Sequence, residues 1–518
     1  MFTFNEFTIR SLFLISTVVL ASCYFLLVCT RRVFFSSLRH IPGPFAARLS
    51  NLSLAIEGVK GRRVYVRQLC GTETFSEMLI ILDTKALDEL HNKYGDVVRV
   101  GPNEVSIANW RHLRAIYASP KTVEKDPAFY ANASFVGKNN IFQMVNPTEH
   151  AARRKLSSPP YALQSVSKLD PLIQQKADDL AHRLVTEASA STTNTADAYK
   201  LCGLFSFETI CKAAFAKDFE GSGGAESSLK LLRAMDGSAP TLILDVVFPF
   251  LRPTGLGVRL PGVIGDAYRS LRYWEQQSRN MVDHFLEKSS SDEKYLLSPI
   301  ATGIDGYLGR RLTHEELVEE AMGYMFAGSG TTSSTMTYLL YALSLSENEH
   351  VQQRLYNEIN AVPSGDISAL RQHPYLNAVI KETLRRFPTI VSTLPRVLLE
   401  PLQVDEYLLP KGTVVGMQNW IHHRNPDVFP DPDRFNPERW LHSTEAMEAS
   451  LTPFGIGRRN CIGQNLAWEE LYLAVSAVMR AGLKLRLGPE MAHWEMEMED
   501  RFNIAPRGRR LMLEVTRR

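Results

Sequence analysis

The sequence predicts a mainly α-helical protein with a small β subdomain, preceded by one transmembrane helix. Most of the chain carries apolar residues at helical spacing. Short strand-like patches lie at 97–107, 414–417 and 511–515. Near the N-terminus, residues 12–29 form an uncharged run of 18 residues, which at about 1.5 Å per residue crosses most of a bilayer core of roughly 30 Å.

Composition narrows the class of protein. The 518 residues are 45% hydrophobic and 22% charged with a net charge of +2, so the chain can bury a large core and lacks the basic excess of a nucleic-acid-binding protein. Its six cysteines show no framework spacing and no C-x-x-C pair, which disfavours a disulfide scaffold or a zinc finger. The bulk of the chain is therefore expected in a reducing compartment.

The N-terminal run is interpreted as a membrane anchor. Arg31 and Arg32 follow it, and the positive-inside rule then places the C-terminal part in the cytosol, although Arg10 on the other flank reduces the contrast. The expected layout is a short lumenal terminus (1–11), an anchor (12–29), a basic and proline-rich hinge (30–45) and one large domain (46–518). A cleaved signal peptide is the alternative, disfavoured because the run exceeds a usual h-region.

The main domain begins with strands and continues mostly as helices. Val97–Val100 and Glu104–Ile107, separated by Gly-Pro, predict a hairpin, and strands are also expected at Val414–Met417 and Leu511–Val515. The predicted helices are Pro171–Glu187, Tyr268–Lys288, His314–Leu345, Val351–Ile359 and Tyr375–Phe387. Capping boxes are expected at Thr313 with Glu316 and at Ser346 with Glu349. Surface loops are expected at Ala188–Ala196, Gly221–Ser228 and Ser289–Glu293.

The helix predicted over His314–Leu345 has an unusual interior. Its sequence Ala-Gly-Ser-Gly-Thr-Thr at 327–332 contains two glycines, each of which costs about 1 kcal/mol relative to alanine within a helix. This cost indicates either the close approach of something flat, a local opening of the helix, or a tight helix crossing.

Residues 454–463, Phe-Gly-Ile-Gly-Arg-Arg-Asn-Cys-Ile-Gly, place Cys461 between closely spaced glycines at the start of a predicted helix. Unpaired N–H groups at a helix N-terminus, with Arg458 and Arg459 nearby, are expected to lower the pKa of the thiol. Taken alone, such a cysteine is either a metal ligand or a nucleophile.

Two further elements accompany this cysteine. Glu382 and Arg385 are three residues apart on one predicted helix, so they share a face and can pair, although such a pair alone is usually solvated. The proline-rich stretch 425–440 must be an irregular loop, and its Arg439 can join the pair in a buried ion network.

Together these motifs resemble the cytochrome P450 family of heme-thiolate monooxygenases, most closely its fungal microsomal members. The Glu-x-x-Arg element is Glu382 with Arg385, and the oxygen-binding helix motif is 327–332. The family's cysteine signature, Phe-x-x-Gly-x-Arg-x-Cys-x-Gly, is met by Phe454, Gly457, Arg459, Cys461 and Gly463. The resemblance implies the P450 fold, a triangular helical prism around heme.

The resemblance also implies roles for single residues. Cys461 would be the axial ligand of the iron in heme b (iron protoporphyrin IX), a thiolate that favours O–O cleavage. Gly463 would allow close approach of the porphyrin, and Phe454 would shield the sulfur. The residues expected to bind the heme propionates are Arg459, Arg396, His150 and Arg154.

On the oxygen side of the heme, Thr331 and Thr332 are the predicted catalytic residues, supported by Ser329 and ordered water. The chain departs from the family here, because Gly330 replaces the acidic residue that usually precedes the threonine. Glu319 and Glu320 lie two to three turns earlier and are not expected to substitute for it.

Partners are implied by the same resemblance. Electrons would come from NADPH through NADPH-cytochrome P450 reductase, with cytochrome b5 as a further candidate partner and O2 as co-substrate. A basic patch of Arg153, Lys155, Arg458 and Arg459 could dock the reductase; plain solvation or propionate binding is the alternative. The expected location is the endoplasmic reticulum membrane, with a single pass and the catalytic domain in the cytosol.

The substrate is expected to be a lipophilic small molecule of fungal secondary metabolism. By analogy its contacts would be Phe135, Phe142, Phe326, Ala327, Val391 and Phe502. Two other functions remain open: a heme-thiolate isomerase or dehydratase that needs no reductase, which the loss of the acid favours, and a non-catalytic heme-binding protein.

Overall fold

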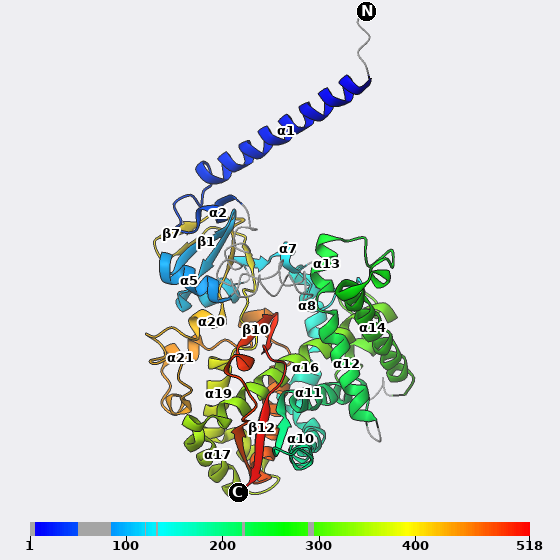
Figure 1. Cartoon of the computed structure of the whole chain (residues 1–518), viewed down its shortest axis with the longest axis vertical. Coiled ribbons are helices and arrows are strands. Elements are labelled where there is room, and N and C mark those ends of the chain that lie inside the picture. The colour runs from blue at the N-terminus through cyan, green and yellow to red at the C-terminus, as the bar shows by residue number, and fades with distance from the viewer. Residues whose placement is uncertain (1–5, 50–83, 120, 131–132, 220–222, 289–294) are drawn as a thin grey trace, which may run out of the picture. The chain divides into compact units, whose positions relative to one another are not determined.

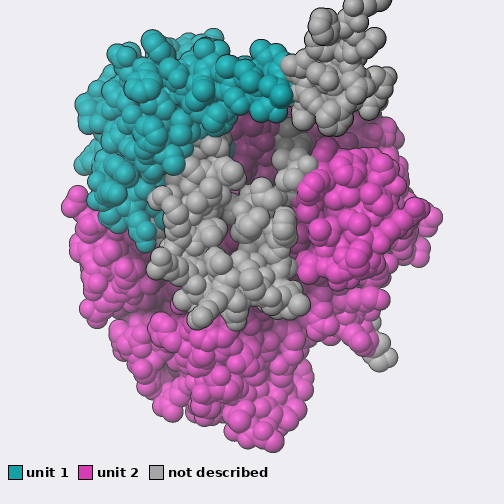
Figure 2. All heavy atoms as spheres, turned by 45° about the horizontal axis from the view of Figure 1, so that its top comes forward, with its two compact units in different colours: residues 1–73, 81–123, 394–417 teal, residues 74–80, 124–393, 418–518 magenta. Residues whose placement is uncertain are grey.

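The computed structural model describes residues 6–49, 84–119, 121–130, 133–219, 223–288 and 295–518 (Figure 1). The chain forms two compact units (Figure 2), and the single catalytic domain predicted for 46–518 stays a prediction. The first unit comprises residues 1–73, 81–123 and 394–417, and the second comprises 74–80, 124–393 and 418–518. Because the chain passes repeatedly between the two units, no linker in the sequence marks the division.

The predicted anchor lies within α1 (Glu6–Phe34) of the first unit. Among the described residues, one helical span, Ile15–Phe34, is long and apolar enough to cross a membrane. The helix extends beyond both ends of the predicted anchor and includes residues 6–11 and 30–34. Arg31 and Arg32 fall in its last turn, where the helix dipole favours cations.

The proline segment after α1 is packed against β1 (Val97–Gly101). Ile41 is fully buried, and the carbonyl of Pro42 accepts a 2.7 Å hydrogen bond from the N–H of Arg99. The buried Arg99 guanidinium also donates to the carbonyls of Arg32 and Leu38. The predicted hinge is therefore fixed to the first unit, because its backbone carbonyls are partners of a buried arginine.

The first unit is built on a mixed sheet of order β1-β2-β8-β5-β3. The predicted hairpin is confirmed, since β1 pairs antiparallel with β2 (Glu104–Ile107), and the strand predicted at 414–417 is β8 (Val414–Gly416), parallel to β2. The remaining strands are β5 (Arg396–Leu398), β6 (Leu402–Val404) and β7 (Tyr407–Leu409), together with β3 (Val123–Lys125), of which only Val123 belongs to this unit. The short helices are α2 (Phe45–Leu49), α5 (Thr84–Tyr94) and α6 (Leu113–Tyr117).

The second unit is largely helical and contains the predicted helices. Those longer than ten residues are α8 (Pro147–Ser157), α10 (Asp170–Ala190), α11 (Ala198–Phe215), α12 (Gly224–Ser238), α14 (Gly262–Lys288), α16 (His314–Ser344), α17 (Glu349–Ala361), α19 (Pro374–Arg386) and α22 (Gln464–Arg480). The shorter ones are α7 (Pro127–Tyr130), α9 (Leu163–Val166), α13 (Thr241–Val247), α15 (Ser298–Thr302), α18 (Ile367–Gln372), α20 (Asn419–His422) and α21 (Glu445–Ser450).

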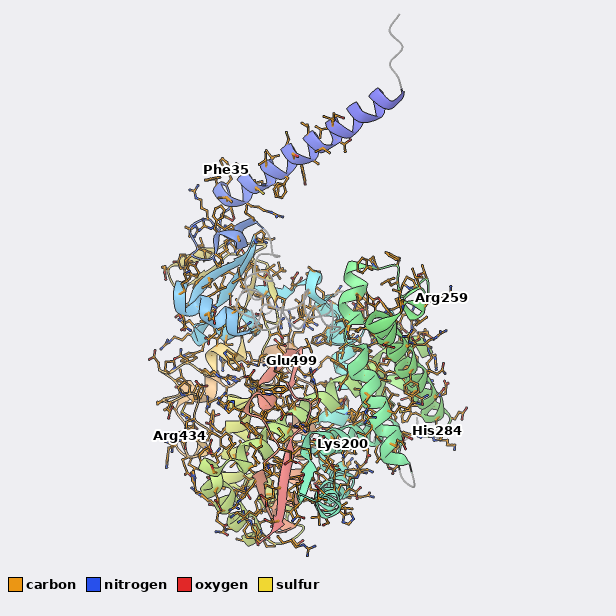
Figure 3. The ribbon with its side chains drawn as sticks, in the orientation of Figure 1. Phe35, Lys200, Arg259, His284, Arg434 and Glu499 are labelled. Carbon is orange, nitrogen blue, oxygen red and sulfur yellow. The ribbon has the colours of Figure 1, made fainter. Side chains whose placement is uncertain are left out.

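Two small sheets complete the second unit. One has the order β4-β12-β9, from β4 (Thr195–Asp197), β12 (Met512–Arg517) and β9 (Leu483–Leu487). The other is the hairpin of β10 (Met498–Arg501) and β11 (Asn503–Pro506). Glu499, labelled in Figure 3, lies on β10 and pairs with Arg509. The strand predicted at 511–515 is thus β12, displaced by one residue at its start.

The long helix α16 is the central helix of this unit. Its predicted capping box is confirmed, because Thr313 Oγ1 accepts from the N–H of Glu316 while the Glu316 carboxylate accepts from the N–H of Thr313. The helix packs along α11 (Figure 1). A Cβ on Gly328 would lie 2.6 Å from Cγ1 of Ile210 on α11, so this glycine is explained by a tight helix crossing.

Several local predictions were wrong at their boundaries. Ser346 caps no helix: its hydroxyl donates to Glu347, residues 346–348 form a 3₁₀ turn, and α17 starts at Glu349. The loop predicted at 188–196 shrinks to four residues, 191–194, because α10 continues to Ala190 and β4 starts at Thr195. The loop predicted at 221–228 is helical from Gly224. The predicted loop 289–293 lies outside the described residues.

Candidate functional site

The loop before α22 presents Cys461. The N–H of Cys461 donates to the carbonyl of Phe454 at 2.8 Å, which closes the loop. Gly455 and Gly457 have φ values of 65° and 72°, a left-handed conformation that glycine adopts without strain. Gly463 is the N-cap of α22, so Cys461 lies two residues before the N-cap, close to the start of a helix as predicted. The ring of Phe454, in the loop, lies 6.3 Å from the ring of Trp468 on α22.

The pKa of the Cys461 thiol is controlled mainly by burial, which raises it above its ordinary value. The N–H of Gly463 bonds to the sulfur and, together with the charge of Arg154, acts in the opposite direction. Burial thus opposes the predicted lowering of this pKa, and the roles of Arg458 and Arg459 in it stay predictions. Cys461 nevertheless keeps accessible surface. An accessible side chain that is surrounded by protein atoms is the arrangement expected of a residue that contacts a group bound inside the second unit.

A cluster of cations surrounds His150 on α8, close to the cysteine loop. His150 is buried, and burial lowers the pKa of its imidazole to about 3, assisted by the positive charges of Arg459, Lys125, Arg154 and Arg458. Four positive charges acting on one buried ring favour a bound anion. This arrangement fits the two negatively charged propionates of heme. Lys125 belongs to the cluster, although it was not among the propionate partners predicted from the sequence.

Two of these arginines brace the cysteine loop. Arg154 on α8 donates to the carbonyl and the side-chain oxygen of Asn460 at 2.7 and 3.0 Å. Arg459 donates to the carbonyls of Met144 and Val145 at 2.7 and 2.8 Å. The loop and the segment before α8 are thus tied together next to the sulfur.

Arg396, the remaining predicted propionate partner, lies on β5 in the first unit. Its guanidinium donates to the carbonyls of Leu394 and Pro395 and lies 5.0 Å from the centre of the Tyr117 ring. Its proposed heme contact stays a prediction.

One face of α16 is accessible within an otherwise buried helix. Ala327 is exposed and Thr331, one turn later, is partly exposed; the Thr331 hydroxyl donates to the Ala327 carbonyl at 2.8 Å. Thr332 and Ser329 are buried at 4% and 1% exposure, and Ser329 donates to the Met325 carbonyl. Of the two predicted catalytic threonines, Thr331 is therefore the one with accessible surface, and the catalytic role of both stays a prediction.

Fewer residues of the predicted basic patch are exposed than expected. Arg153 is buried, with its guanidinium 2.8 Å from Asp305 and paired with Glu320 on α16. Glu320 is therefore engaged in an ion network, and the expectation that it does not replace the missing acid stays a prediction. Lys155 and Arg458 remain exposed.

Glu382 on α19 is the centre of the predicted ion network. The carboxylate is fully buried and pairs with Arg385 at 2.8 and 2.9 Å and with Arg439 at 3.2 Å. It also accepts from the N–H of Asn436 at 2.9 Å and from the indole of Trp440 at 2.8 Å. These last two donors come from the proline-rich loop, which the carboxylate therefore holds against the helix.

Four of the predicted substrate contacts belong to a continuous row of aromatic rings. Phe142 lies 5.5 Å from Phe502, Phe502 lies 6.2 Å from Phe326, and Phe326 lies 5.8 Å from Phe135. Trp274 on α14 extends the row beyond Phe135 at 5.0 Å. Phe326 directly precedes the exposed Ala327, so the row borders the accessible face of α16. Val391, by contrast, is buried at 3% exposure.

Comparison with known proteins agrees with this arrangement. The family model for cytochrome P450 matches residues 83–498. A cytochrome P450 monooxygenase, orf2 of Aspergillus niger, is 28% identical over 96% of this chain and 97% of its own length. The monooxygenase aflV of Aspergillus parasiticus is 28% identical over 93% of this chain and 92% of its own. The solved structure of a retinoic-acid-bound cyanobacterial CYP120A1 covers 84% of this chain with a TM-score of 0.70 and 18% identity, which shows the fold.

The fold and the site define a heme-thiolate oxidoreductase. The chain belongs to the cytochrome P450 family, and the mainly helical fold class with small sheets is confirmed. The family implies heme as the cofactor, and the accessible Cys461 beside a cationic cluster fits that group.

Proposed function

We propose that the protein is a membrane-anchored monooxygenase that inserts one atom of O2 into a lipophilic small molecule. The second oxygen atom leaves as water, and two electrons from NADPH balance the reaction. The observation that carries this proposal is the accessible Cys461 sulfur in a loop braced by Arg154 and Asn460. When bound, heme with a thiolate ligand supplies the chemistry that cleaves O2.

The ligand assignment is tested by the spectrum of the reduced, carbon-monoxide-bound protein. The wild type should show the red-shifted Soret band of thiolate ligation. Cys461→Ala should lose this band, and Cys461→His should bind heme with the band at the unshifted position. An unshifted band in the wild type would overturn the proposal.

The proposed roles around the heme follow from the placement of the residues. His150, Arg154, Arg459 and Lys125 would hold the propionates, and Gly463 and Phe454 would border the sulfur. The heme contact predicted for Arg396 is retained as a separate proposal. Thr331 holds a proton or a water on the accessible face of α16. Solvent protons reach this hydroxyl through ordered water, because Gly330 offers no carboxylate.

Electrons are proposed to come from an NADPH-cytochrome P450 reductase, with cytochrome b5 as a second donor. Lys155 and Arg458 supply exposed positive charge for an acidic docking face, whereas Arg153 is enclosed by its carboxylate partners. Lys155→Glu with Arg458→Glu should raise the reductase concentration needed for half-maximal heme reduction, and added salt should reduce the difference from wild type. An unchanged requirement would exclude this docking face.

The apolar part of α1 is proposed to anchor the protein in the endoplasmic reticulum membrane, with the P450 domain in the cytosol. The length and composition of Ile15–Phe34 and the two arginines in its last turn support this topology. Protease added to sealed microsomes should digest the domain. Protection of the domain would place it in the lumen instead.

The aromatic row and the fungal relatives favour a lipophilic substrate of secondary metabolism. Deletion of the gene should accumulate one such precursor, which the purified enzyme converts with label from oxygen gas. A reductase-independent isomerase or dehydratase is the second candidate, favoured by Gly330. Turnover of the precursor under anaerobic conditions without NADPH would establish that alternative.

A further inference from the structure

Two neighbouring buried carboxylates on α16 bind the loop that contains Phe135. Glu320 accepts from the N–H of Ile141 at 3.1 Å, and Glu319 makes the larger set of contacts. Glu319 is fully buried and accepts from the N–H groups of Phe135 at 2.8 Å, Val136 at 2.7 Å and Lys138 at 3.4 Å. The side-chain amide of Asn140 donates to it at 2.7 Å. The loop therefore folds around this carboxylate, which lies 184 residues away from Phe135 in the sequence.

A positive charge holds the opposite side of the same backbone. Arg252, in the segment after α13, donates to the carbonyl of Ser134 at 3.2 Å and to the carbonyl of Phe135 at 2.8 Å. The carbonyl of Ser134 and the N–H of Phe135 belong to one peptide group, and the carbonyl of Phe135 and the N–H of Val136 belong to the next. Two consecutive peptide groups are thus bound at one end by Glu319 and at the other end by Arg252.

This arrangement couples the two charges through the peptide dipoles. A carboxylate at the N–H end and a guanidinium at the carbonyl end each polarise the peptide group in the same direction, so each strengthens the bond made by the other. Arg252 is itself fixed, because it pairs with Asp245, which accepts a 2.7 Å hydrogen bond from the hydroxyl of Tyr268 on α14. The loop is therefore connected to α16 on one side and to α13 and α14 on the other.

The residue between the two bound peptide groups is Phe135. Its ring lies 5.0 Å from Trp274 and 5.8 Å from Phe326, and its side chain is 9% exposed. A backbone held at both of its peptide groups leaves this ring little freedom to leave the row. The position of Phe135 thus depends on two charged residues that are not themselves members of the row.

We propose that Glu319 and Arg252 are a pair of positioning residues that determine substrate selection by fixing Phe135 against Phe326 and Trp274 in the aromatic row. The inference rests on the proposed function in one respect, namely that the row borders the substrate. Loss of either charge frees the two peptide groups, so Phe135 leaves Phe326 and Trp274 and the site accepts larger apolar molecules.

The backbone part of the proposal is tested by hydrogen exchange of the full-length heme-loaded protein. Glu319→Gln and Arg252→Gln should each increase exchange in the peptides covering 133–141 by more than tenfold. Glu315→Gln, which removes a more exposed carboxylate on the first turn of the same helix, is the matched control and should leave that segment unchanged. Because both residues act through the same peptide groups, the double variant should exchange no faster than the faster single variant.

The selectivity part is tested with a series of 1-alkylimidazoles of increasing chain length, whose binding is followed by the Soret shift. In the wild type the dissociation constant should change steeply with the length of the alkyl chain. In Glu319→Gln and in Arg252→Gln, the ratio of the dissociation constants for long and short chains should be at least threefold closer to one. Glu319→Asp, which keeps the charge but shortens the side chain, should behave like Glu319→Gln and serves if the glutamine variant fails to fold. Unchanged exchange, additive effects in the double variant, or an unaltered chain-length dependence would each overturn the proposal.

These outcomes are distinct from failure of the proposed function. The thiolate Soret band with carbon monoxide reports heme ligation in every variant. If the wild type lacks that band, the monooxygenase proposal fails while the exchange data still report on the loop. If the band is present and the loop variants match the wild type, the positioning role fails alone.

Discussion

The side-chain amide nitrogen of Asn503 lies 2.6 Å from the point that a Cβ on Gly330 would occupy. The place from which the family's acidic side chain would project is therefore filled by a neutral amide from the hairpin of β10 and β11. This hairpin is held to α16 by a 2.6 Å hydrogen bond from the Ser334 hydroxyl to the Ile504 carbonyl. The N–H of Ile504 also donates to the carbonyl of Thr389 at 2.8 Å.

The first prediction is that substitution by alanine affects stability differently at Gly328 and at Gly330 of α16. Gly328→Ala should destabilise the protein by about 1–2 kcal/mol, because its Cβ would overlap the buried Ile210 at a tight helix crossing. Gly330→Ala should be neutral or stabilise by up to about 1 kcal/mol, because alanine favours the helix and the end of the Asn503 side chain can rotate away. Apparent melting temperatures at equal heme content measure both.

Asn503→Ala combined with Gly330→Ala is the control for this comparison. The double variant removes the close contact and should be as stable as Gly330→Ala or slightly more stable. Equal losses for Gly328→Ala and Gly330→Ala would contradict the distinction between a packed crossing and a movable side chain.

The second prediction concerns the buried network of Glu382. Glu382→Gln should cost about 3–5 kcal/mol or prevent accumulation of heme-loaded protein, because it leaves the buried charges of Arg385 and Arg439 without a carboxylate. The measure is the free energy of unfolding in urea together with heme content.

The neighbouring residue offers a matched control. Lys381 pairs with Glu448 at 2.7 Å on the surface, and Lys381→Met should cost no more than about 1 kcal/mol. A similar cost for both substitutions would show that burial of the Glu382 network contributes nothing beyond an ordinary surface pair.

Sequence reasoning succeeded where neighbouring residues determine the structure. The capping box of Thr313 and the hairpin at 97–107 depend on local spacing, and the pairing of Glu382 with Arg385 follows from helical periodicity. A matching local pattern is not sufficient, however. Ser346 has the same local pattern as Thr313, yet a 3₁₀ turn intervenes before α17.

In the candidate site, too, local features were predictable from the sequence, whereas burial and contacts between distant residues were not. The position of Cys461 before α22 was predictable from its motif, whereas burial reversed the expected direction of the pKa shift of its thiol. Arg153 was expected on the surface, but Asp305 and Glu320 enclose it from distant parts of the chain. The contact of Glu319 with a loop 184 residues away has no signal in the sequence, since a glutamate on a helix usually faces solvent.

The third prediction tests the cationic cluster as the site of the heme propionates. Lys125→Met should accelerate transfer of heme to an excess of apomyoglobin several-fold, because one of the charges near His150 is lost. Lys155→Met on α8 removes an exposed charge and should leave the transfer rate unchanged. If the two variants lose heme at the same rate, Lys125 does not bind a propionate.

The fourth prediction is a pH dependence of stability from the capping box of α16. Hydrogen bonds from Arg310, and then from the backbone and hydroxyl of Thr313, lower the pKa of Glu316 from 4.5 to about 2. A carboxyl with a depressed pKa in the folded state contributes stability above its unfolded pKa and loses it as the pH falls toward the folded pKa. Relative to Glu316→Gln, the wild type should therefore be more stable by about 1–3 kcal/mol at pH 7.

This difference should begin to shrink below a pH of about 4.5 and should vanish near pH 2, because protonated Glu316 no longer carries the charge that Arg310 binds. The free energies of unfolding of the two proteins in urea, measured between pH 7 and the lowest pH at which both remain folded, give the comparison. Glu287→Gln, at an exposed position of α14, should give no such trend. A stability difference that stays constant over this range would show that Glu316 acts through its shape and not through its charge.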